Sequence, residues 1–172
     1  ASRDRSANWW MKAMDLNDEA RLLRSVPLFQ RIDSSKLRLL AFSSERYSYA
    51  PGEIICRQGD DGDSAFVILI GNAEVMVSLP EASGGEMLHK VADLGPNAIV
   101  GEMSVLCNRP RSATVRAVTP MEALRIERGV LLNLLQTDPI VMNEVLHVLA
   151  ERLAVTTEEL GRARKVSAGG DA

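Results

Sequence analysis

The sequence is poor in the residues that build metal centres and disulfide frameworks. It has two histidines, His89 and His147, and two cysteines, Cys56 and Cys107, among 172 residues. Neither cysteine belongs to a CxxC pattern, which argues against a thiolate zinc site and against a disulfide-stapled fold. We therefore expect no metal, and a cytoplasmic setting in which thiols stay reduced.

Other functional signals are also missing. No run of roughly 18 apolar residues occurs, so no membrane span is predicted. There is no GxxxxGK[ST] loop, and no serine or cysteine lies in a recognisable nucleophile motif. The net charge of −3 shows no basic excess, which argues against a general affinity for nucleic acid. We expect a protein that is not an enzyme and does not itself bind nucleic acid.

What is present is the pattern of a globular domain, with 46% hydrophobic and 25% charged residues. Residues 15–42 predict two helices, the second capped by Ser34, with a turn at Pro27. Between residues 45 and 126 the stretches "SAFVILI", "AEVMVSL" and "EALRI" alternate like strands and are separated by turns rich in glycine and proline. Short strands divided in this way predict an antiparallel barrel or roll.

Helical periodicity returns at residue 128 and predicts a short helix followed by a long one. The long helix begins at Thr137 or Asp138, with Pro139 just inside its first turn. Its apolar residues form two stripes. The first stripe is a heptad seam of Met142, Leu146, Leu149, Leu153, Thr156 and Leu160, and the second is Val141, Val145 and Val148. We expect one stripe to pack on the roll and the other on a partner helix, giving a homodimer. The alternative is a single wide stripe that faces the core.

The predicted class is therefore α+β. An N-terminal helical segment (1–43) precedes an antiparallel β-roll, a jelly-roll-like barrel (44–127), and C-terminal helices follow (128–172). Trp9 and Trp10 lie before the first helix, where they either pack against it or form an interaction site.

The segment "GEMSVLCNRPRSATV", residues 101–115, carries the chemistry. Arg111 follows Glu102 by nine positions and precedes three small residues. An arginine fork matches a phosphate and keeps its charge, and small neighbours let backbone N–H groups approach an anion. A glutamate only accepts hydrogen bonds, which suits a sugar hydroxyl. The pair thus indicates a sugar-phosphate ligand; the alternative is a plain ion pair across a loop.

The same segment resembles the phosphate-binding cassette of the cyclic nucleotide-binding domain family. That cassette has a Gly-Glu, a short helix, a loop, an arginine, two small residues and a hydrophobic strand. The stretches "PLF" and "PGEIICRQGDDGDSAFVILIGNAEVMV" and the flanking helices resemble the same family, so the likeness covers residues 20–160. It implies a regulatory sensor that binds cAMP or cGMP and relays binding through its C-terminal helix to an effector outside the chain. The alternative is an unliganded roll that serves as a dimerisation or docking scaffold.

The resemblance also implies individual roles. Glu102 matches the acid that binds the ribose 2′-hydroxyl, and Arg111 matches the arginine that pairs with the cyclic phosphate. Gly101 lets the chain pass beside the ribose. The hydroxyl of Ser112 permits cGMP without excluding cAMP. The implied cassette site is Gly101, Glu102, Met103, Ser104, Arg111, Ser112 and Ala113, with the N–H groups of Ser104, Ser112 and Ala113 lining the phosphate.

The stretch "RLAVTTEELG" resembles the dimerisation helix of the bacterial catabolite activator branch of the family. In that branch two adjacent hydroxyl residues contact the purine, one of them from the partner subunit. Thr156 and Thr157 stand at the matching positions, which favours cAMP. The alternative is that the threonine pair only tunes the helix seam.

Overall fold

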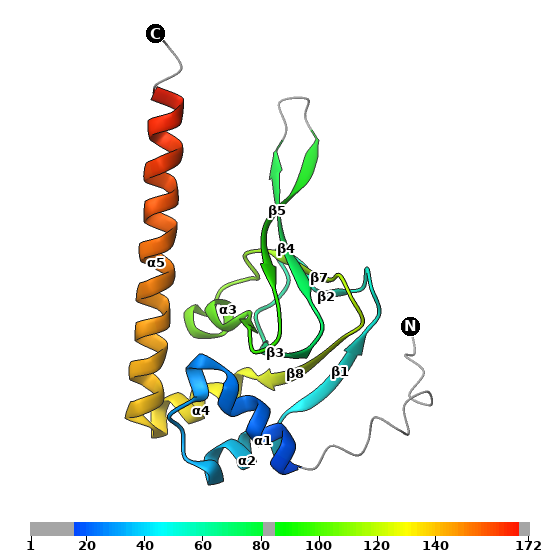
Figure 1. Ribbon diagram of the computed structural model, residues 1–172, viewed down its shortest axis with the longest axis vertical. Helices are drawn as coiled ribbons and strands as arrows, with labels where there is room; N and C mark the ends of the chain where they lie inside the picture. The colour runs from blue at the N-terminus through cyan, green and yellow to red at the C-terminus, as the bar shows by residue number, and fades with distance from the viewer. Residues whose placement is uncertain (1–15, 81–84, 169–172) are drawn as a thin grey trace.

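Two four-stranded antiparallel sheets form a roll, with helices before and after it in the chain (Figure 1). The structure, a computed structural model, describes residues 16–80 and 85–168. The first sheet has the order β1 (Glu45–Tyr49), β8 (Met121–Glu127), β3 (Ser64–Ile70), β6 (Ile99–Val100), and the second β2 (Ile54–Cys56), β7 (Thr114–Ala117), β4 (Ala73–Pro80), β5 (Glu86–Leu94). The predicted α+β class and antiparallel roll are confirmed.

The helices lie on either side of the roll in the sequence. Before it come α1 (Leu16–Ser25), the 3-10 turn η2 (Pro27–Phe29) and α2 (Ser34–Phe42), and after it α4 (Arg128–Thr137) and α5 (Pro139–Ala168). A short helix, α3 (Glu102–Cys107), interrupts the roll between β6 and β7. None of the helices within the described ranges is long and apolar enough to cross a membrane.

Strand β3 divides two apolar cores. Val67 and Leu69 face a cluster that includes residues of α1, α2, α4 and α5, whereas Phe66 and Ile68 face the interior of the roll. Side chains of a strand point alternately to opposite faces, so a strand covered on both faces is apolar throughout. This explains why "SAFVILI" has almost no polar residue.

The N-terminal helices follow the predicted boundaries with one correction. Val26 is extended, with φ −73° and ψ 126°, as expected before Pro27. The cap of α2 is Asp33, not Ser34: its carboxylate accepts from the Ser35 N–H at 2.8 Å. Asp33 has the extended ψ of 143° that a cap needs, and Ser34 is already the first helical residue.

The start of α5 is tied to the N-terminal helices. Asp138 caps α5 by accepting from the Ile140 N–H at 3.0 Å, as the pattern around Pro139 predicts. Its other oxygen accepts from Lys36 Nζ at 2.7 Å. The N-terminal and the C-terminal helices therefore meet at one buried carboxylate.

The two apolar stripes of α5 have different surroundings. Val141 and Val145 are buried in the helical cluster, which confirms that this stripe packs on the core. Three seam residues face outward, with exposed fractions of 38% for Met142, 58% for Leu146 and 69% for Leu153. A single core-facing stripe is thus excluded over this part of the helix.

Leu149 departs from the predicted seam, because it is half-buried and packs against the helical cluster. Its position on the helix lies between the two stripes, so it contacts the core from the edge of the seam. The side chains of Val148, Thr156 and Leu160 lie outside the described residues.

The sequence patterns did not predict β5. All but the last of its residues are exposed, so no alternation of buried and exposed positions marks it as a strand. It pairs along the whole of β4, and the resulting hairpin projects from the roll (Figure 1).

Candidate functional site

Arg111 is 4% exposed and lies directly after the loop that follows α3. Its backbone is held at both ends by the loop between β2 and β3. The Arg111 N–H donates to the Asp60 carbonyl at 2.8 Å, and the Arg111 carbonyl accepts from the Gly59 N–H at 2.9 Å. These two bonds fix where the side chain starts.

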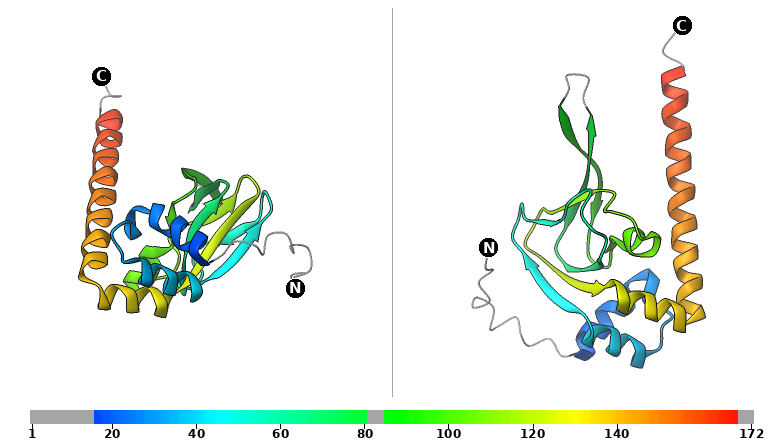
Figure 2. Two further views of the ribbon diagram at one scale, coloured as in Figure 1. Left: turned by 60° about the horizontal axis from the view of Figure 1, so that its bottom comes forward. Right: turned by 180° about the vertical axis from the view of Figure 1, so that it is seen from behind.

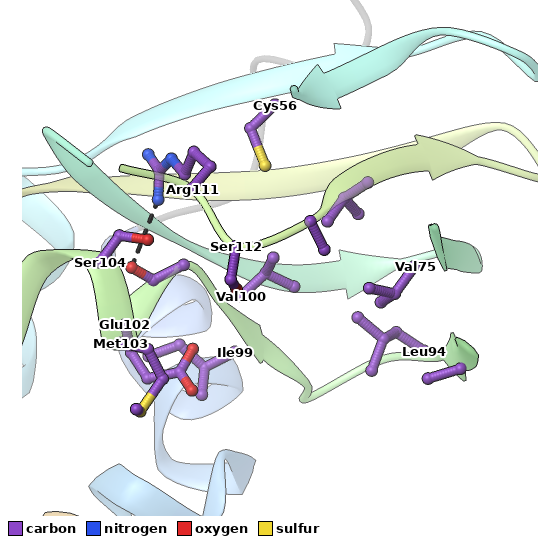
Figure 3. Close-up of a pocket in the computed structure, with 14 residues that line it drawn as sticks. Cys56, Val75, Leu94, Ile99, Val100, Glu102, Met103, Ser104, Arg111 and Ser112 are labelled. Atoms are coloured by element: carbon purple, nitrogen blue, oxygen red, sulfur yellow. Dashed lines mark hydrogen bonds between the residues drawn. The ribbon is translucent and has the colours of Figure 1, made fainter. Parts of the chain in front are cut away.

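The guanidinium has partners on its two terminal nitrogens. Nη2 donates to Ser64 Oγ at 3.1 Å and lies 3.4 Å from Asp63 Oδ1. Nη1 donates to the Gly101 carbonyl at 3.3 Å, and Figure 3 shows Arg111 at the edge of the cavity. The ring of Phe66 lies below, with its centroid 5.7 Å from the guanidinium carbon. This is the geometry of a cation–π contact.

The third nitrogen, Arg111 Nε, is buried and finds no hydrogen-bond partner in the described part of the chain. Leaving a buried donor unpaired costs about 1–3 kcal/mol, and more for a charged group. A native structure therefore rarely keeps such a donor without a reason. Arg111 Nε therefore still lacks an acceptor that the described residues do not supply.

Asp63 is the carboxylate at ion-pair distance from Arg111, and it also pairs with Arg125 at 2.8 Å. Burial would raise the pKa of Asp63, but the Ser64 hydrogen bond and the charges of Arg125 and Arg111 together lower it. Asp63 is therefore ionised at neutral pH. The ion pairs of Asp63 stabilise the fold at pH values above 3.8, the ordinary pKa of an aspartate. This stabilisation is lost as the pH falls through the lowered pKa of Asp63.

Two glycines let the chain close around the arginine. Gly101 has φ +78°, and a Cβ placed on it would lie 2.0 Å from Arg111 Nη1. A Cβ on Gly62 would lie 2.5 Å from the Cβ of Ser104. Contacts this short are not seen for real Cβ atoms, so a side chain at either position would force a neighbour to move: the Arg111 guanidinium at Gly101, and the backbone carbonyl of Arg109, 2.6 Å away, at Gly62.

A cavity of about 330 Å³ opens beside Arg111, within the size range of small-molecule sites of roughly 300–1,000 Å³. The structure brings together around it all the residues predicted in the cassette: Gly101, Glu102, Met103, Ser104, Arg111, Ser112 and Ala113. The predicted short helix that starts near Glu102 is α3 (Glu102–Cys107).

The remaining wall is apolar and was not predicted. It comes from both sheets and consists of Cys56, Val75, Ala92, Leu94, Ile99, Val100 and Val115 (Figure 3). Burial raises the pKa of the Cys56 thiol, although the nearby charge of Arg111 opposes it, so this wall stays uncharged at neutral pH. The alternation in "AEVMV" could have indicated that Val75 faces inward. Asp63 gave no signal, because it belongs to a stretch interpreted only as a turn, and Ser64 was interpreted only as the start of a strand.

Glu102 is 4% exposed and begins α3. Figure 3 shows its side chain with Met103 on the Ile99 side of the cavity, away from Arg111. The plain ion pair across the loop is therefore not favoured, since Asp63 is the carboxylate at ion-pair distance from Arg111. The Glu102 carboxylate and the Arg111 guanidinium therefore lie at separate ends of the cavity.

Thr157 of α5 does not line this cavity in the described part of the chain. Thr157 is exposed, and its hydroxyl donates to the Leu153 carbonyl at 2.8 Å. The side chain of Thr156 lies outside the described residues. Across residues 16–80 and 85–168, no group of three or more His, Cys, Asp or Glu residues could hold a metal ion.

Comparison with known proteins gives a consistent result. The model of the cyclic nucleotide-binding domain matches residues 46–138. A cyclic nucleotide-gated potassium channel of Mesorhizobium japonicum is 32% identical over 105 residues, which are 61% of this chain and 26% of the channel. The cAMP-dependent protein kinase regulatory subunit of Dictyostelium discoideum is 33% identical over 107 residues, 62% of this chain and 32% of the subunit. The chain thus spans between a quarter and a third of the length of these relatives.

Among solved structures, the Thermus thermophilus catabolite activator protein is similar, with a TM-score of 0.69 and 30% sequence identity. The match covers 80% of this chain and 63% of that one.

Replacing Gly101 by alanine should destabilise the protein more than replacing Gly52, which is the matched control. Gly52 has φ +86° with no atom within 4 Å of its Cβ position. Gly52→Ala should cost only the left-handed conformation, about 1–2 kcal/mol. Gly101→Ala should cost about 1.5–3 kcal/mol more, because the new methyl displaces the hydrogen-bonded guanidinium. Urea unfolding measures both, and equal losses would mean that Arg111 is not held as described.

Proposed function

The chain belongs to the cyclic nucleotide-binding domain family, and from this premise we propose that its cavity binds cAMP or cGMP as a regulatory signal, with no catalytic step. The observation that carries the proposal is the buried Arg111, whose Nε has no acceptor in the described chain and borders the cavity. A cyclic phosphate carries a full negative charge and several acceptor oxygens. It would supply the missing acceptor and balance the charge that the exposed Asp63 balances only in part.

The phosphate end is supported by backbone donors beside Arg111. The first hydrogen bond within α3 runs from the Val105 N–H to the Gly101 carbonyl, at 3.3 Å. The Ser104 N–H precedes this bond and has no partner inside the helix. Ser112 and Ala113 are small and line the cavity, so their N–H groups are open to close approach by an anion. We assign these three N–H groups and Arg111 to the phosphate.

The ribose is assigned to the opposite end of the cassette. Glu102 is buried and lines the cavity away from Arg111, which separates its charge from a phosphate that it would repel (Figure 3). A carboxylate there accepts a hydrogen bond from the 2′-hydroxyl. Gly101 and Met103, on either side of it, complete this end.

The apolar wall is assigned to the purine. Val75, Leu94 and Val115 present a surface on which a base can pack, as apolar linings do in most small-molecule sites. The Ser112 hydroxyl at the cavity would permit cGMP without excluding cAMP. We propose cAMP as the preferred ligand on the strength of the adjacent hydroxyls of Thr156 and Thr157, with cGMP as the competitor.

The relay to an effector outside the chain is proposed to run through α3. Val105 of α3 is buried in the same cluster as Leu131 of α4 and as Val141 and Val145 of α5. A shift of α3 on ligand binding would change this packing, because close-packed cores do not absorb displacements gradually. The signal would then leave through the long C-terminal helix.

A homodimer is proposed through the seam of α5. Met142, Leu146 and Leu153 form an exposed apolar row that a second α5 would cover. Thr157 is exposed on the same helix, from which it could reach the cavity of the partner subunit.

Arg111→Ala should weaken the binding of both nucleotides by about 2 to 5 kcal/mol, because the phosphate loses its charged partner. Arg109→Ala is the matched control: Arg109 is exposed two positions away, so its removal should change affinity by no more than about 0.5 kcal/mol. Titration calorimetry with cAMP and with cGMP measures both effects. A wild-type chain that binds neither nucleotide would leave the scaffold alternative standing.

Glu102→Gln should weaken binding of the ribose nucleotide by about 1.5 to 3 kcal/mol, because it removes a charge-assisted hydrogen bond to the 2′-hydroxyl. The 2′-deoxy analogue, which lacks that hydroxyl, should lose little further affinity in the variant. The double comparison by calorimetry isolates the bond. If the wild-type protein binds the deoxy analogue as tightly as the parent, Glu102 has a different role.

Leu146→Asp with Leu153→Asp should give a monomer in sedimentation velocity, since facing carboxylates in an apolar seam are costly to bury. Asn143→Asp with Ala154→Asp adds the same charge at exposed positions outside the seam and should leave the dimer intact. If the wild-type chain is monomeric at high concentration with ligand, both the seam and the contact from the partner's threonine are wrong.

A further inference from the structure

A second groove lies between α2 and α4, apart from the ligand cavity and sharing no lining residue with it. Its volume is about 400 Å³. The apolar part of its lining is Leu39, Leu40, Val130 and Leu134, and the remainder is Lys36, Ser43, Gly129, Asn133 and Thr137. Lys36 already pairs with Asp138, so the groove presents no uncompensated charge of its own.

The outer edge of this groove exposes two large apolar side chains. Leu39 is 64% exposed and Phe42 is 71% exposed. They are three residues apart on α2 and therefore lie on one face of that helix. An apolar groove with an apolar rim is a surface that another segment covers.

The chain before α1 emerges next to this rim. Arg24, near the end of α1, donates to Ser34, the first residue of α2, at 2.7 Å. At the other end of the pair, Asn17 and Asp18 of α1 line a groove together with Leu37 and Arg38 of α2. The two helices therefore run antiparallel, and the start of α1 lies toward the end of α2. Figures 1 and 2 show the start of α1 next to α2.

Residues 1–15, the part of the chain before α1, contain both tryptophans of the protein, Trp9 and Trp10, with Met11 and Met14. Trp10 is six residues before Leu16, so an extended chain carries it up to about 20 Å from that point. An α-helix with its side chains is about 10–12 Å across, so this length is enough to pass α2 and reach α4.

We propose that the segment around Trp9 and Trp10 docks in the groove between α2 and α4 and covers Leu39 and Phe42. Aromatic side chains bring the largest apolar area, and an indole N–H needs one acceptor, which Asn133 or Thr137 at the rim can provide. A segment tethered six residues away is present at millimolar effective concentration, which favours it over a segment from a second molecule.

Tryptophan fluorescence of the full 172-residue chain tests the proposal, because both tryptophans lie in this segment. Emission should be blue-shifted and shielded from acrylamide relative to the same chain in guanidinium chloride. Leu39→Asp with Phe42→Asp should remove the apolar cover and raise the quenching constant about threefold. Leu88→Asp with Val91→Asp, at exposed positions of β5, is the matched control and should leave quenching unchanged.

Any of three other results would overturn the proposal. Quenching in the wild-type chain equal to that of the unfolded chain means that the tryptophans are not docked. Shielding that survives the Leu39 and Phe42 double variant, with its circular dichroism unchanged, places them elsewhere. Shielding that disappears on dilution assigns the groove to the segment of a second copy. None of these readings depends on nucleotide binding.

Discussion

The buried guanidinium of Arg111 is the constraint on which the site depends. A charge that is 4% exposed is tolerated only where its surroundings are fixed, and each neighbour serves that end. Gly101 is left-handed and lacks a Cβ because Nη1 occupies that space, and Phe66 offers its ring face. Asp63 balances part of the charge from the solvent side. Arg111 Nε is still without a partner in the described part of the chain, and this is the reason for proposing an anion at this position.

The same arrangement connects the site to the helices. Strand β3 separates the interior of the roll, which borders the cavity, from the helical cluster, and α3 contributes Val105 to that cluster. The helical cluster in turn holds the start of α5, whose cap Asp138 is bonded to Lys36 of α2. The proposed relay would use this packing: a ligand at Arg111 would act on α3, which packs in the same cluster as the N-terminal and C-terminal helices, and would thereby change the position of α5.

The sequence could predict those features of the fold and the site that depend on a pattern within one short stretch of residues. Strands with alternating faces, the two C-terminal helices and the cassette residues were predictable, since each is a pattern within a short stretch. Asp63 was not, because it meets Arg111 across 48 positions of sequence. The apolar wall is assembled from several strands, and β5 is exposed on both faces and so lacks periodicity. Leu149 fits a heptad by spacing, yet the 3.6-residue period of a helix turns it toward the core.

The central claim is that the free Nε of Arg111 marks the position of a cyclic phosphate. A crystal structure of the chain with cAMP tests it most directly. The account predicts a phosphate oxygen about 2.7–3.2 Å from Arg111 Nε, with the ribose 2′-hydroxyl at the Glu102 carboxylate. A nucleotide bound with its phosphate elsewhere, and Nε still without an acceptor, would contradict it.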